Sequence, residues 1–140
     1  AARMVEIEAL TSPLRRLPTV AILASSDDEG EVLARHLSEK LAPHTISVVA
    51  CPSGRIIGHD GDVRVFDVQH IKGLEFEAVF FVDIDTLAMR IPQLFDKFLY
   101  VGATRAATYF GLTCSGSGLP TKLSGLESHF ARTWEASTLS

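Results

Sequence analysis

The stretch TVAILASSDDEGEVLARHLSEKLAPHTISVVA, residues 19–50, contains a complete strand–helix–strand pattern. Its first six residues form a continuous apolar run, which is typical of a strand covered on both faces of a parallel sheet. Two serines and three acidic residues then favour the start of a helix, whose apolar residues recur at helical spacing until Pro43 ends it. Residues 46–50 are apolar again and predict a second strand. We therefore expect an α/β fold with a mainly parallel sheet flanked by helices.

The remainder of the chain continues this alternation. The functional loops of such a sheet are expected at the carboxyl ends of its strands. Pro92 is expected in the first turn of a helix whose apolar stripe ends at Val101. The other predicted elements are a glycine-rich loop at residues 51–62, strands at 63–68, 78–82 and 109–113, and a last helix at 126–134.

Length, composition and charge limit what the chain can be. With 140 residues, 46% of them hydrophobic, it is expected to form a single domain spanning residues 1–140. A net charge of -4 argues against an autonomous electrostatic nucleic-acid binder, because such domains usually carry a basic face. No apolar run is long enough to span a membrane, and Cys51 and Cys114 form no CxxC motif. We expect a soluble, cytoplasmic protein without membrane contact.

Several complete catalytic motifs are absent. The sequence has no Gly-Lys dipeptide, so it lacks the GxxxxGK[ST] loop that cradles nucleotide phosphates. The run VFFVDID, residues 79–85, ends in acids as magnesium-holding strands do, but without that loop we interpret Asp83 and Asp85 as the exit from a buried strand. The five histidines show no metal-ligand spacing, so no metal site is expected. Residues 114–120, CSGSGLP, fail the GxSxG pattern of a nucleophilic serine.

Two segments carry a specific resemblance. VFDVQHIKGLEFEAVFFV, residues 65–82, and FLYVGATRAAT, residues 98–108, resemble motifs V and VI of UvrD/Rep-like superfamily 1 DNA helicases, with the cores KGLEF and LYVxxTRA in the family's order. Residues 20–37 resemble more weakly the strand and helix that precede motif V in these proteins. The resemblance implies a C-terminal RecA-like domain of the P-loop NTPase type, from a longer protein. Only residues 51–62 occupy the place of the family's large inserted domain, which indicates the compact type.

The resemblance also implies roles for individual residues. By residue type alone, Arg105 is a surface or salt-bridging residue and Glu75 a turn-capping acid. The resemblance implies that Arg105 is the catalytic arginine finger and reaches across to ATP, which is bound with Mg²⁺ mostly by a separate N-terminal RecA-like domain. It also implies that Glu75 accepts a hydrogen bond from the ribose. The family often has histidine and threonine where this chain has Gln69 and Asp67. The expected nucleotide-binding residues are Gly73, Glu75, Tyr100 and Thr104, and the expected contacts to single-stranded DNA are Gln69 and Lys72.

Two functions remain open at this level. The first is the C-terminal motor domain of an ATP-dependent DNA helicase or translocase, which contributes part of a shared ATP site. The alternative is a non-catalytic interaction or regulatory module derived from such a domain. An upstream GxxxxGK[ST] in the same reading frame would favour the motor.

The missing phosphate loop gives a direct prediction. The purified chain alone is expected to have negligible ATPase activity, with or without single-stranded DNA, because it lacks the phosphate-binding half of the site. A steady-state phosphate-release assay measures this. Appreciable turnover by the isolated chain would contradict the half-site interpretation.

Overall fold

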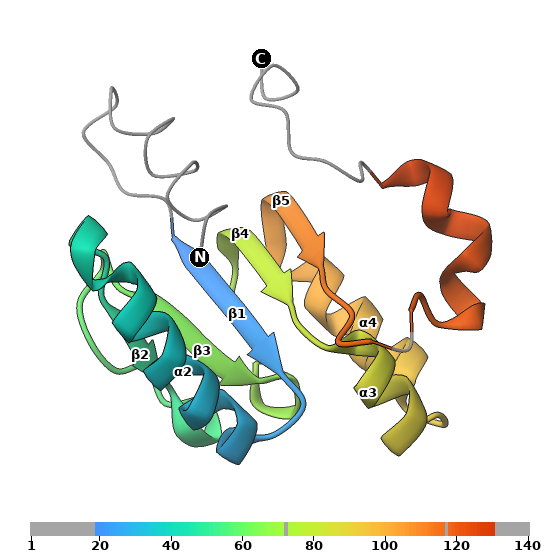
Figure 1. Cartoon of the computed structure of the whole chain (residues 1–140), viewed down its shortest axis with the longest axis horizontal. Helices are drawn as coiled ribbons and strands as arrows, with labels where there is room; N and C mark the ends of the chain where they lie inside the picture. The colour runs from blue at the N-terminus through green and yellow to red at the C-terminus, as the bar shows by residue number, and fades with distance from the viewer. Residues whose placement is uncertain (1–18, 72, 117, 131–140) are drawn as a thin grey trace.

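A five-stranded sheet forms the centre of the computed structural model of this chain, which describes residues 19–71, 73–116 and 118–130. The strand order is β2-β3-β1-β4-β5, and every neighbouring pair is parallel (Figure 1). The predicted α/β fold with a parallel sheet is therefore confirmed. The strands are β1 (Val20–Ala24), β2 (Val48–Ala50), β3 (Val63–Asp67), β4 (Phe76–Phe81) and β5 (Ala106–Leu112).

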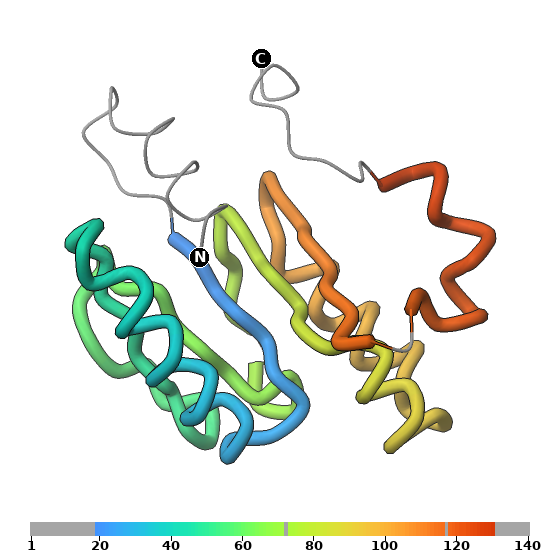
Figure 2. The backbone as a smooth tube through the Cα atoms, in the orientation of Figure 1, coloured from blue at the N-terminus to red at the C-terminus, as the bar shows by residue number. Residues whose placement is uncertain are grey.

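Helices cover both faces of this sheet, as the tube trace also shows (Figure 2). The central strand β1 is buried along its whole length, as its continuous apolar run predicts. Val20 and Ile22 point into a core cluster that contains Ala34 and Leu41 of α2 (Asp27–Leu41). The alternate residues of β1 point into a second cluster, formed with α3 (Ile84–Arg90) and α4 (Phe95–Thr104). No helix in the described part of the chain has the length and apolar character that a membrane span requires.

Helix α2 begins and ends close to where the sequence predicts. Ser26 is its N-cap, and the Ser26 hydroxyl accepts a hydrogen bond from the Glu29 amide at 3.2 Å. The helix ends at Leu41, immediately before a short 3₁₀ turn, Ala42–His44, that contains Pro43.

Three predictions about the second half of the chain were wrong in detail. Helix α3 was not predicted, because seven residues with only Ile84 and Leu87 as buried apolar side chains give little helical periodicity. Pro92 lies in the turn before α4, so it is not in the first helical turn. The last helical segment is a 3₁₀ helix, Thr121–His129, which starts earlier than predicted, and residues 131–134 of the predicted helix lie outside the described residues.

Gly102 allows α4 to approach the sheet closely. A Cβ atom at this position would lie 2.7 Å from Phe81 Cδ2 and 3.0 Å from Leu23 Cδ1. Both of these side chains are fully buried, so neither can move aside without disturbing the core. The position of α4, which ends at the predicted motif VI residues, therefore depends on this glycine.

We predict that Gly102→Ala lowers the free energy of unfolding by about 1–2 kcal/mol, because overpacking exceeds the gain in helix propensity. Urea unfolding followed by circular dichroism measures the change. Gly125→Ala is the matched control, because nothing lies within 4 Å of a Cβ atom built there. Equal stabilities of the two variants would contradict the close packing of α4.

Candidate functional site

A backbone hydrogen bond links the two motif segments. The Phe76 amide donates to the Arg105 carbonyl at 2.8 Å, and Phe76 pairs with Ala106 where β4 meets β5. Glu75 directly precedes β4, and Arg105 directly precedes β5. The structure therefore brings Glu75 and Arg105 together at the amino ends of two neighbouring parallel strands.

This placement corrects one expectation from the sequence. The functional loops were expected at the carboxyl ends of the strands, and for Glu75 and Arg105 that expectation is wrong. A chain that leaves the carboxyl end of β3 must return to the amino edge of the sheet before it can start the parallel strand β4. Gln69, which follows β3, therefore lies at the carboxyl edge, opposite to Glu75.

The Arg105 side chain has hydrogen-bonding capacity that its own domain does not use. Arg105 caps the end of α4, and its Nη2 atom lies 3.4 Å from the Thr104 hydroxyl oxygen. Its Nε atom is buried and has no hydrogen-bond partner among the described residues. A buried donor without a partner costs about 1–3 kcal/mol, so a change of side-chain conformation that exposes this donor to an acceptor would be favourable.

Tyr100 and Thr104 lie one helical turn apart on α4. The Thr104 hydroxyl is within hydrogen-bonding distance of the Tyr100 carbonyl at 2.9 Å and of the Val101 carbonyl at 3.0 Å, which fixes the last turn of the helix. Tyr100 is 70% exposed, so its ring is available to another molecule or domain.

The remaining predicted residues lie between β3 and β4. Gly73 has a φ of +76° and open space around its Cα, so the backbone conformation, and not packing, requires glycine there. Gln69 is exposed in a 3₁₀ turn, Val68–His70, and its amide donates to Asp67 Oδ1 at 2.8 Å. Lys72 lies outside the described residues.

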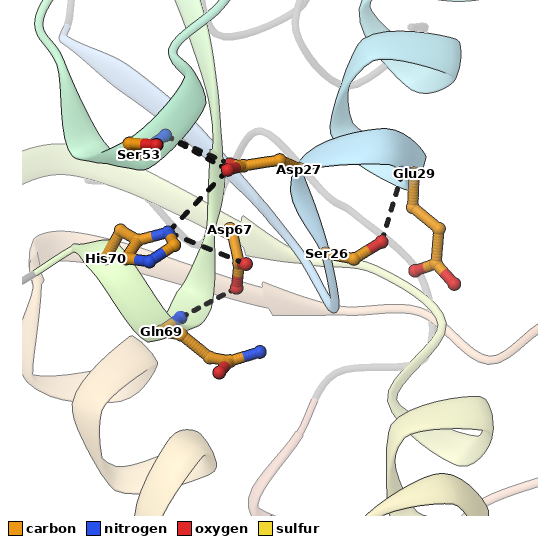
Figure 3. A network of polar contacts seen from close by, with 7 residues as sticks. All are labelled: Ser26, Asp27, Glu29, Ser53, Asp67, Gln69 and His70. Carbon is orange, nitrogen blue, oxygen red and sulfur yellow. Dashed lines mark hydrogen bonds and ion pairs between the residues drawn. The ribbon is translucent and has the colours of Figure 1, made fainter.

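A polar cluster that the sequence did not predict lies at the carboxyl edge (Figure 3). His70 Nδ1 lies 3.6 Å from Asp67 Oδ2 and 3.9 Å from Asp27 Oδ2, and the Asp27 carboxylate accepts from the Ser53 amide. Burial raises the pKa of Asp67, an effect that the Gln69 amide and His70 oppose and that the charges of Asp27 and Glu29 strengthen. Asp67 and His70 are three residues apart, but Asp27 comes from the start of α2, so no local motif could reveal the whole cluster.

Asp85 has a structural role that its position after a strand does not suggest. It is buried, and its carboxylate accepts from the backbone amides of Ser115 at 2.8 Å and Gly116 at 3.2 Å. Asp85 therefore holds the turn that follows β5. Asp83 precedes α3 with a left-handed backbone, at a φ of +53°.

Residues 62–113 match the family model of the UvrD-like helicase C-terminal domain. The matched range contains both motif segments, residues 65–82 and 98–108, so the resemblance to this family is confirmed. The crystal structure of the C-terminal domain of a possible DNA helicase from Lactobacillus plantarum WCFS1 has the same fold. Its TM-score is 0.61 at 24% sequence identity, over 85% of this chain and 68% of that chain. A comparison with curated proteins found no match.

The environment of Asp83 leads to a pH-dependent prediction. Burial raises the pKa of Asp83 above its ordinary value of 3.8, and the neighbouring Asp85 and Glu29 charges raise it further. The folded chain therefore binds this proton more tightly than the unfolded chain, and stability falls as the pH rises from 3.8 through the raised pKa. Asparagine carries no charge and also tolerates the left-handed conformation.

We expect Asp83→Asn to raise the melting temperature at neutral pH, with a gain that shrinks as the pH falls toward 3.8. Thermal unfolding across this pH range measures the effect, with Asp60→Asn in an exposed loop as control. A gain that is constant over the whole pH range would contradict the assigned cause.

Proposed function

We propose that this chain is the C-terminal RecA-like motor domain of an ATP-dependent DNA helicase. It would contribute part of an ATP site that it shares with an N-terminal RecA-like domain of the same cytoplasmic protein. The observation that carries the proposal is the hydrogen bond between the Phe76 amide and the Arg105 carbonyl. This bond places an acid and an arginine from the two helicase-like motifs at one edge of the sheet, within the range that matches the family.

Arg105 is the proposed catalytic residue. Its guanidinium is planar and permanently charged, which suits the γ-phosphoryl group of ATP, whose charge is spread over several oxygens. The unpartnered Nε atom supports this role, because a movement of the side chain toward the second domain would let this donor reach an acceptor there. Arginine fingers contribute on the order of a thousandfold or more to hydrolysis, which corresponds to about 4 kcal/mol of transition-state stabilisation.

The neighbouring residues would position the nucleotide. Glu75 lies next to Arg105 across the β4–β5 pairing, and its carboxylate can accept a hydrogen bond from a ribose hydroxyl. Tyr100 and Thr104 hold the end of α4, from which Arg105 projects, and the exposed Tyr100 ring is free to contact the nucleotide or the second domain. Gly73 permits the turn that delivers Glu75 to the edge.

The second domain would hold most of the ATP and its Mg²⁺, because this chain has no phosphate loop. Single-stranded DNA would contact Gln69 at the opposite edge, and by the resemblance it would also contact Lys72. With the two ligands at opposite edges of one sheet, closure of the domains on ATP would move the DNA-binding edge as part of a rigid body. Alternate closure and opening would then advance the protein along the strand.

The test uses the protein in which this domain is joined to its N-terminal RecA-like domain. Arg105→Ala is expected to lower DNA-stimulated kcat for ATP hydrolysis about a thousandfold, because the transition-state charge loses its partner. Arg105→Lys is expected to recover little, because an ammonium lacks the planar fork of donors. Steady-state kinetics give kcat and KM separately.

Arg35→Ala is the control, because Arg35 is exposed on α2 and belongs to neither motif segment. Circular dichroism confirms that each variant is folded. Near-normal turnover by folded Arg105→Ala would show that Arg105 is not the finger. Absence of DNA-stimulated turnover in the unsubstituted protein would instead favour the non-catalytic module.

A further inference from the structure

The Asp27, Asp67 and His70 cluster has the spacing of ligands around a single ion. One oxygen from each carboxylate and one imidazole nitrogen all lie within 4.8 Å of one another. The His70 Nδ1 distances of 3.6 and 3.9 Å are too long for good hydrogen bonds. With metal–ligand bonds of about 2.1 Å at tetrahedral angles, however, two ligands of one ion lie roughly 3.4 Å apart, so these groups would have to close in by only a few tenths of an ångström. Figure 3 shows the imidazole facing both carboxylates.

The charges at the cluster also favour a cation. The Asp67 side chain is only 6% exposed. The carboxylates of Asp27 and Glu29 repel its negative charge. Within the described residues, no lysine or arginine forms a salt bridge with Asp27 or Asp67, whose ionic partner there is His70. A buried carboxylate without a permanent positive partner is costly, and a divalent cation between the three groups would offset that cost.

Backbone groups already orient both carboxylates. The Gln69 amide donates to Asp67 Oδ1, which leaves Asp67 Oδ2 directed toward His70. The Ser53 amide donates to the Asp27 carboxylate at 3.1 to 3.2 Å. Such outer hydrogen bonds are the usual means by which a protein holds metal ligands in place. The register that pairs Ala24 with Asp67 brings the start of α2 beside the end of β3.

We propose that Asp27, Asp67 and His70 form a binding site for one divalent cation of the Zn²⁺ or Mn²⁺ type. Two carboxylate oxygens and one imidazole nitrogen form a mixed set of donors that suits these ions. Three protein ligands leave further coordination positions for water. The bound ion ties the first turn of α2 to the 3₁₀ turn after β3 and neutralises part of an acidic edge.

The experiment uses the purified 140-residue chain after treatment with a chelator. Zn²⁺ titration by calorimetry is expected to give one site per chain, and Mn²⁺ is expected to broaden the NMR signals of the His70 ring selectively. His70→Gln and Asp67→Asn are each expected to weaken Zn²⁺ binding at least about tenfold. Asparagine keeps an oxygen that can accept from the Gln69 amide. Asp67→Asn therefore removes the carboxylate charge but leaves the 3₁₀ turn after β3 in place.

His36→Gln and Asp28→Asn are the matched controls, because both residues are exposed on α2 and outside the cluster. They are expected to leave the Zn²⁺ affinity unchanged. The proposal would be overturned by the absence of stoichiometric binding or by equal Mn²⁺ broadening of several histidines. The proposal would also be overturned if the His70 ring signals stayed unchanged when Zn²⁺ was added, because His70 would then interact with the carboxylates alone. The broadening measurement needs no variant, so it decides the matter even if a substitution disturbs folding.

Discussion

The pairing of β4 with β5 is the constraint on which the candidate site depends. Its first hydrogen bond, from the Phe76 amide to the Arg105 carbonyl, joins the last residue of the KGLEF core to the arginine of the LYVxxTRA core. The bond places Glu75 and Arg105 at the amino ends of the strands only if α4 ends at the level of those strand ends. Gly102 fixes the position of α4 along the sheet by its close contact with Phe81. The packing of one helix and the register of one strand pair therefore fix the separation of Glu75 and Arg105 together.

The central strands connect the amino and carboxyl ends of the sheet rigidly, so that the two ends move as one body. β1, β3 and the middle of β4 are buried between helices on both faces, and interiors packed in this way resist deformation. A displacement at the Arg105 edge is therefore carried to the Gln69 edge as a movement of the whole body. This rigidity is what the proposed motor needs, because ATP and DNA would contact opposite ends of the same strands.

Sequence patterns predicted what depends on local chemistry and missed what depends on topology. The continuous apolar run of β1 and the serine cap of α2 are local signals, and both were confirmed. Helix α3 was missed because two buried residues do not define a period. The edge at which Glu75 lies could have been deduced, since parallel strands force the chain back to their amino ends. The Asp27, Asp67 and His70 cluster could not, because it arises from the register between β1 and β3.

The charge of the carboxyl edge sets a condition on any nucleic acid that binds there. Asp67 stands where related helicases often have threonine, and Asp27 lies near it, so a phosphate that binds at Gln69 would be repelled by two neighbouring carboxylates. Gln69 is neutral and cannot compensate for them. A divalent ion held by these acids would cancel their two negative charges, and its open coordination positions would be available to a phosphate oxygen. The same residues that make this edge unfavourable for DNA without an ion would then provide its contact with phosphate.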